Sequence, residues 1–329
     1  MRVRDMTEGN PLRLMLAFAV PLFIGNIFPQ IYRIVDTMVV GYNLGDNAIS
    51  AVGATYSLHG LLLSAAIGLN GGYAIIVTQK FGAHNREELK QSIAGMILLN
   101  GVVTFPVVLV PVIFIRPIMR FMNTPAAIFE DAFTYIVIVG VGMIFTIGYN
   151  MFAGILRAMG NSRTPLVFLI ISSVLNVILD ILLVAGFEMG VAGAALATIM
   201  AQGISAALSG WYIFKHYKEV LPAKEDFRVS REMLGEMLSA GVAMGLMYSV
   251  VETGNVIFQS ANNQLGESFI TAHTASRTII GALTQMLGTL ANACATFVGQ
   301  NWGAGHSGHS AFVYAGGRAE KGATYFQWN

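Results

Sequence analysis

Apolar runs of about 20 residues, separated by short polar loops, dominate this chain of 329 residues. A run of that length crosses the hydrocarbon core of a bilayer as an α-helix, and these runs lack the two-residue alternation of a membrane β-barrel. Apolar residues make up 55% of the chain and charged residues only 11%, which is outside the range of soluble domains. The sequence therefore predicts an all-α, multi-pass membrane protein. The eight predicted spans are Leu14–Val40, Tyr56–Thr78, Ile93–Ile115, Tyr135–Leu156, Leu166–Ala185, Val191–Phe214, Leu238–Ala261 and Ile270–Val298.

Lysine and arginine lie mostly in one set of loops. Thirteen precede the first span or follow the second, fourth and sixth, whereas the loops of the opposite side hold only Arg116 and Arg120. Positive charge is retained on the cytoplasmic side of membrane proteins, so the N-terminus is predicted to be cytoplasmic. The apolar stretch from Leu14 is too long for a signal-peptide core, and we interpret it as a retained first span.

The chain contains an internal repeat. Residues Leu44–Ala83 align without a gap to Leu265–Ala304, with 13 identities in 40 positions. Six predicted spans separate equivalent points, so the two copies have the same orientation in the membrane. A parallel repeat of this kind, related by an axis along the membrane normal, is one of the symmetries found in transporters.

The second copy of the repeat is incomplete. We predict a six-helix N-lobe over residues 1–214, a cytoplasmic linker over 215–236, a partial C-lobe with two spans over 237–305, and a polar tail over 306–329. A truncated or frame-shifted reading frame is the interpretation we favour for this tail. On that interpretation the 329-residue form is expected not to transport by itself.

Two acids lie deep inside apolar segments. Asp36 lies in the first predicted span, and Asp180 lies in the fifth with Asn176 one helical turn before it, on the same helix face. An ionisable group at the bilayer centre costs about 2.5–3.5 kcal/mol on insertion scales, so such groups are usually functional. A pair of carboxylates with neutral oxygens suits Na⁺, and it equally suits a proton.

Other polar residues could complete or modulate such a site. Thr198, Asn150 and Tyr135 offer oxygens at comparable predicted depth, and each could equally serve only to bond helices together. Glu252 is the acid of the second half and is either a second cation site or a polar group facing a central cleft. Pro21 removes a backbone hydrogen bond within the first span and is predicted to act as a hinge or to fix a static kink.

Several classes of chemistry are excluded by the sequence. It contains no Walker A motif, no legible Ser/His/Asp set and no basic tract for nucleic acid, so we predict neither an enzyme nor a nucleic-acid partner. Its single cysteine, Cys294, excludes an internal disulfide. We expect no organic cofactor. The two buried acids are expected to bind Na⁺ or H⁺, and this ion would drive transport as the coupling ion.

Five motifs occur along the chain: Ile34–Gly41 (IVDTMVVG), Gln79–Ala83 (QKFGA), Leu156–Pro165 (LRAMGNSRTP), Asn176–Asp180 (NVILD) and Gly190–Thr198 (GVAGAALAT). Together they resemble the multidrug and toxic compound extrusion (MATE) family of cation-coupled antiporters. The resemblance covers about residues 10–305.

The resemblance implies a fold of two six-helix lobes around a central cleft and a rocker-switch mechanism of alternating access. It implies a monomer in a bacterial or archaeal cytoplasmic (inner) membrane, surrounded by lipid, that exports amphipathic or cationic small molecules. Asp36, Asn176, Asp180 and Thr198 match cation-binding positions, Asn150 and Tyr135 match their surround, and Glu252 resembles an acid of another branch. Two alternatives stay open: a lipid-linked saccharide flippase of the same superfamily, which would favour basic residues in the cleft, and a non-transporting membrane fragment.

Overall fold

Eight long α-helices account for most of the described residues of the computed structural model, which are residues 5–122, 124–263 and 267–306. The predicted tail lies outside them from residue 307 onward. The helices are α1 (Pro11–Leu44), α2 (Asp46–Gly82), α3 (Arg86–Phe121), α4 (Phe129–Ala158), α5 (Arg163–Asp180), α6 (Gly190–His216), α7 (Arg231–Asn263) and α8 (Glu267–Gly303). All regular secondary structure in the described part of the chain is helical, as the apolar runs predict.

Six helical stretches among the described residues are long and apolar enough to cross a membrane. They are Pro11–Phe28, Asp46–Gly82, Ala126–Ala158, Arg163–Gly186, Gly190–His216 and Arg231–Gly254. Each of the eight predicted spans lies within a helical segment of the structure. The exact number of membrane crossings stays a prediction.

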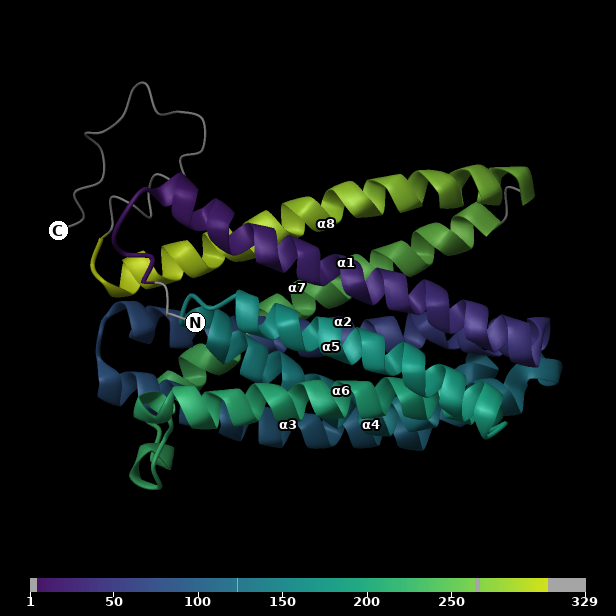
Figure 1. Ribbon diagram of the computed structural model, residues 1–329, viewed down its shortest axis with the longest axis horizontal. Coiled ribbons are helices and arrows are strands. Elements are labelled where there is room, and N and C mark those ends of the chain that lie inside the picture. The colour runs from purple at the N-terminus through teal and green to yellow at the C-terminus, as the bar shows by residue number, and fades with distance from the viewer. Residues whose placement is uncertain (1–4, 123, 264–266, 307–329) are drawn as a thin grey trace.

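The helices run alternately up and down the bundle, which gives it two ends. We call the end that holds the starts of α1, α3, α5 and α7 the basal end, and the other the apical end (Figure 1). A single glycine, Gly45, links α1 to α2 at the apical end, with φ of 83°. This is the left-handed region that glycine adopts without steric cost, so the two helices can reverse direction within one residue.

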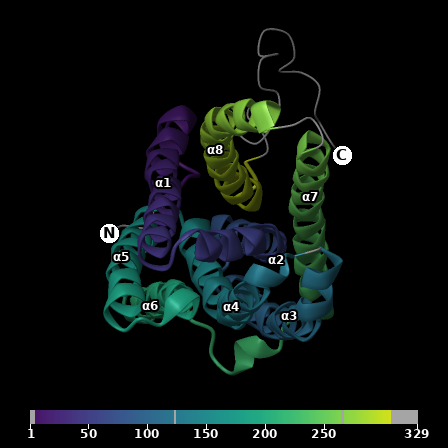
Figure 2. The same cartoon turned by 90° about the vertical axis from the view of Figure 1, so that its right-hand side faces the viewer.

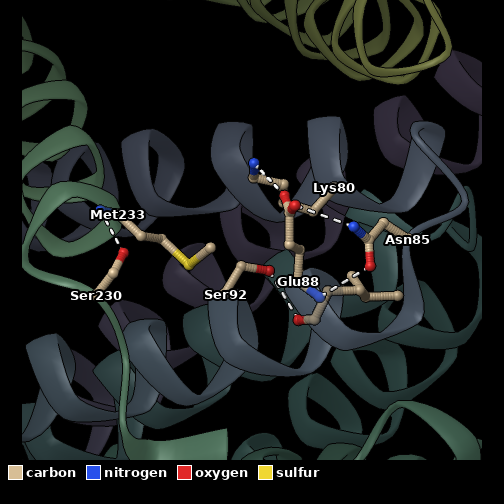
Figure 3. Close-up of polar contacts among 7 residues, drawn as sticks. Lys80, Asn85, Glu88, Ser92, Ser230 and Met233 are labelled. Carbon is tan, nitrogen blue, oxygen red and sulfur yellow. Dashed lines mark hydrogen bonds and ion pairs between the residues drawn. The ribbon is translucent and has the colours of Figure 1, made fainter.

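The basal turn between α2 and α3 is fixed by a small polar network (Figure 3). The Asn85 side chain accepts a hydrogen bond from the backbone N–H of Glu88 at 3.2 Å and so caps α3. Its amide donates to the Glu88 carboxylate at 3.0 Å, and Lys80 pairs with the same carboxylate. In the same view, Ser230 accepts from the backbone N–H of Met233 at 3.2 Å.

The link between α6 and α7 is shorter than predicted. Its polar composition predicts a linker over residues 215–236, whereas α6 continues to His216 and α7 already begins at Arg231. The reason is the Ser230 cap, which starts α7 within the charged sequence. Two short 3₁₀ turns, Lys218–Val220 and Glu225–Phe227, occupy the remainder.

Helix α2 lies at the centre of the bundle and packs against α1, α3, α4, α7 and α8 (Figure 2). Its contact with α7 depends on small residues. A Cβ atom built on Gly68 would overlap the backbone at Gly245, and one built on Gly72 would overlap the backbone of Ala240 and Gly241. Close backbone approach at such residues is a common way for membrane helices to associate.

The basal ends of α2 and α8 meet in a reciprocal contact. A Cβ built on Gly82 would overlap the backbone of Gln300, and a Cβ built on Gly303 would overlap the backbone of Gln79. Gln79 and Gln300 are equivalent in the sequence repeat, and so are Gly82 and Gly303. This is the arrangement expected where a two-fold repeat axis passes between two equivalent helices.

Adding a methyl group at Gly72 is expected to separate α2 from α7. We expect Gly72→Ala to lower the free energy of unfolding by about 1–3 kcal/mol, because rigid backbone occupies the space. Gly60→Ala on the same helix is the matched control, since nothing lies within 4 Å of its added Cβ. It should be neutral or stabilising by up to about 1 kcal/mol. Equal losses in thermal unfolding of the two purified variants would contradict this account.

Candidate cation site

Helices α1 and α5 run parallel, and their contact sets the depth of Asp36. A Cβ built on Gly25 of α1 would lie 3.2 Å from the side chain of Leu166 of α5. Asp36 follows Gly25 by the same number of residues as Val177 follows Leu166. Because the two helices run parallel, Asp36 is level with the segment between Asn176 and Asp180. The carboxylates of Asp36 and Asp180 are close enough to interact electrostatically. Residues far apart in the sequence are thus brought to one depth.

Helices α5 and α6 run antiparallel and bring Thr198 to the same level. The Ser172 hydroxyl on α5 donates a hydrogen bond of 2.8 Å to the carbonyl of Ala201 on α6. Asn176 lies one turn further along α5, and Thr198 lies about one turn back along α6. Antiparallel packing therefore places Thr198, which is partly buried, level with Asn176.

The three central polar side chains are buried and lack hydrogen-bond partners among the described residues. Asp36 is 5% exposed, Asn176 is 2% exposed and Asp180 is fully buried. One carboxylate oxygen of Asp36, both of Asp180, and both polar atoms of the Asn176 amide are unpartnered. Buried polar atoms are nearly always hydrogen-bonded, so a group of unpartnered oxygens in one place indicates a site for an ion or proton.

The chemistry of these donors fits a hard cation. Two carboxylates, an amide oxygen and the Thr198 hydroxyl are oxygen ligands of the kind that such ions prefer. No cluster of three or more His, Cys, Asp or Glu side chains occurs among the described residues, so transition-metal ligation is not indicated there.

An apolar cluster closes the apical side of the acids. We call it the apical seal. It consists of Val40, Ala48, Val52, Tyr135, Val139, Val184, Val191, Ala194 and Ala195. Val40 lies one turn beyond Asp36, and Val184 lies one turn beyond Asp180, within a π turn at Ile181–Gly186. Wide turns of this type occur often at functional sites. Tyr135, predicted to surround the cation, is a member of this seal.

Asn150 lies nearer the basal end than the acids do. The neighbouring Tyr149 donates a hydrogen bond of 3.2 Å to the carbonyl of Pro165, which precedes Asn176 by about three turns of α5. The Asn150 amide donates 2.8 Å to the carbonyl of Thr146 on its own helix. Asn150 is therefore not brought level with the acids, although the sequence predicts a shared depth.

The remaining predicted residues lie on other parts of the bundle. Glu252 is partly buried on α7, two turns beyond the Gly245 contact with α2. Pro21 is buried within α1, which continues as one helix through it.

Comparison with known proteins now identifies the family. The sequence profile named MatE matches residues 21–182, which include Asp36, Asn176 and Asp180. The chain belongs to the MATE family.

Similar proteins agree with this assignment. A probable multidrug resistance protein, YpnP of Bacillus subtilis, is 28% identical over 306 residues, which cover 93% of this chain and 68% of the relative. An FAD transporter of Shewanella oneidensis is 22% identical over 297 residues, covering 89% of this chain and 66% of the relative. This MATE chain thus spans about two thirds of the length of these relatives.

Solved MATE structures share the fold. An outward-facing multidrug resistance MATE transporter superposes with a TM-score of 0.89 at 21% identity, covering 96% of this chain and 70% of that chain. A likeness at this identity establishes the helical arrangement. This chain is accordingly a multi-pass membrane protein of the MATE transporter family.

Proposed function

We propose that this MATE chain is part of a transporter that couples the movement of a cation, Na⁺ or H⁺, to the export of small organic molecules. One observation carries the proposal: the buried, unpartnered oxygens of Asp36, Asn176 and Asp180 lie at one level, on the neighbouring helices α1 and α5. A transporter that uses a cation gradient needs a site that alternates between loaded and empty. Oxygens without protein partners can accept the ion and release it without breaking a hydrogen bond among the described residues.

The two acids are placed to convert ion binding into helix movement. Asp36 lies on α1 and Asp180 lies on α5, so a cation between them draws the two helices together. When the site is empty, two like charges in a low-dielectric interior repel each other, which favours separation of α1 or protonation of one acid. Pro21 gives α1 a point at which it can bend. Glu252, on α7, is proposed as a separate acid whose role is secondary.

The proposed substrates are amphipathic or cationic organic compounds. The acidic polar groups favour such molecules over a lipid-linked saccharide, which would be better matched by basic residues. The relatives named for multidrug resistance support the same class. We place the basal end in the cytoplasm, because the lysine and arginine residues of the sequence concentrate there. The protein is proposed to act as a monomer in the cytoplasmic membrane.

Cation binding to the purified protein tests the proposal directly. We expect saturable binding of radioactive Na⁺, or uptake of a proton measured with a pH indicator, and loss of both in a double variant with Asp36→Asn and Asp180→Asn. Na⁺ binding would identify sodium coupling, and proton uptake insensitive to Na⁺ would identify proton coupling. A wild-type protein that binds neither ion would overturn the proposal.

A further inference from the structure

A short segment before α1 ties the start of α1 to the end of α8. Met6 is 1% exposed, and its side chain packs in a cluster with Met15, Phe18, Ala293 and Phe297 of α1 and α8. We call residues 5–10 the strap. A carboxylate oxygen of Asp5 in the strap also lies 3.5 Å from Nε2 of His84, in the turn between α2 and α3.

Gln300 joins the strap to the first lobe. Its side-chain oxygen accepts a hydrogen bond of 2.8 Å from the backbone N–H of Met6, and its side-chain nitrogen donates 2.8 Å to the carbonyl of Ala158 at the end of α4. The side-chain amide of the neighbouring Asn301 donates a hydrogen bond of 3.0 Å to the carbonyl of Met6 and one of 2.9 Å to the carbonyl of Phe297. Gln300 and Asn301 are both fully buried, so water does not compete for these bonds.

The side-chain contacts described between α1 and α8 lie in the basal half of α1. The hydrogen bonds and cluster contacts described between them involve residues no further along α1 than Asn26, whose amide donates 3.1 Å to the Thr289 hydroxyl of α8. Figure 1 shows the two helices crossing near the basal end and separating toward the apical end. The basal end is therefore the closed end of this arrangement.

We propose that Gln300 is a gating residue, whose bonds to Met6 and Ala158 hold the basal end of the transporter closed. We call Met6, Ala158, Gln300 and Asn301 the basal latch. This inference rests on the proposed function, since alternating access requires the basal end to open in another state. Helix α1 connects the two sites: the strap precedes its first turn, and Asp36 lies near its apical end. A movement of α1 at the cation site would thus pull Met6 from Gln300.

Distance measurements at the basal end test the latch without requiring transport. Spin labels are attached through Lys218→Cys after α6 and Trp302→Cys at the end of α8, both exposed positions, in a Cys294→Ala background. The wild-type latch should give mainly one short distance. We expect Gln300→Leu to raise the ratio of open to closed molecules about tenfold or more, because both bridging bonds are lost.

Two further variants make the result specific. Gln300→Asn keeps the amide but shortens the side chain, which then cannot reach both Met6 and Ala158. This variant should therefore also open the basal end. It decides the question if Gln300→Leu fails to fold. Gln91→Leu on α3 is the matched control, since this partly buried glutamine makes no hydrogen bond to another described residue, and its distances should equal those of wild type.

The outcome is read independently of cation binding. Distances in a folded Gln300 variant that match those of wild type would overturn the latch. Absence of Na⁺ or proton binding in the wild-type sample would instead overturn the proposed function, and the distance change would still decide whether Gln300 holds the basal end closed.

Discussion

Replacing Asp180 with asparagine is expected to abolish cation-driven efflux while leaving the protein folded. Asparagine has nearly the same size, and both carboxylate oxygens of Asp180 are buried without a described hydrogen-bond partner, so no described bond is broken. The amide can neither take up a proton nor supply a negative charge to a cation. We expect the affinity for the coupling cation to fall at least about tenfold, or about 1.4 kcal/mol, and efflux to fall to background. Asp36→Asn should behave in the same way.

Dye efflux measures the effect in cells that express this chain with a complete second lobe, since the 329-residue form is expected not to transport by itself. Asp46→Asn is the matched control, because Asp46 is an exposed carboxylate in the first turn of α2. It should retain wild-type efflux. Glu252→Gln should cause a smaller loss than either site variant if the acids of α1 and α5 carry the coupling. Wild-type efflux in both Asp36→Asn and Asp180→Asn would show that these acids have no part in coupling.

The helices were predictable because each depends on its own stretch of sequence. A run of apolar residues long enough to cross the hydrocarbon must satisfy its backbone internally, and helix is the local solution. The ends were less predictable, since they depend on capping residues: Asn10 caps α1 and Ser230 caps α7 inside segments that the hydropathy pattern treats as loops. The burial of Asp36 and Asp180 was predictable because each lies inside a long apolar run.

Contacts between helices were predictable only where the sequence repeats. The repeat pairs Gln79 with Gln300, and the structure places these glutamines at the crossing of α2 and α8. By contrast, the bond from Met6 to Gln300 joins residues 294 positions apart, and its donor is a backbone N–H that no motif marks. The depth of Asn150 could not be predicted either, because it depends on how far α4 is shifted relative to α5. The π turn after Asp180 likewise has no signature in the apolar sequence around it.

A candidate site made of unpartnered buried groups should cost the protein stability. A polar atom is solvated by water in the unfolded state, and it loses this water when it is buried. Without a hydrogen bond to replace the water, burial of the atom lowers the free energy of unfolding by about 1–3 kcal/mol. Sites kept for function commonly retain such costs, and removing the polar groups then stabilises the fold. Asn176 offers a clean case, since it is uncharged and close in size to leucine.

We therefore expect Asn176→Leu to raise the free energy of unfolding by about 1–3 kcal/mol and to weaken cation binding. The matched control is Asn161→Leu, which removes an equally buried asparagine at the turn between α4 and α5. The Asn161 amide donates hydrogen bonds of 2.9 Å to the hydroxyls of Thr164 and Tyr217. Its oxygen accepts a hydrogen bond of 3.1 Å from the backbone N–H of Thr164. Its loss should destabilise by about 2–4 kcal/mol, because these three buried hydrogen bonds are lost.

Reversible unfolding of the purified variants in mixed micelles measures both changes, and Na⁺ or proton binding is followed on the same samples. The opposite signs expected for Asn176→Leu and Asn161→Leu separate a functional polar site from a structural one. Comparable destabilisation by the two substitutions would mean that the Asn176 amide is hydrogen-bonded in the folded protein. The polar group between α1 and α5 would then be a means of holding helices together rather than a place for an ion.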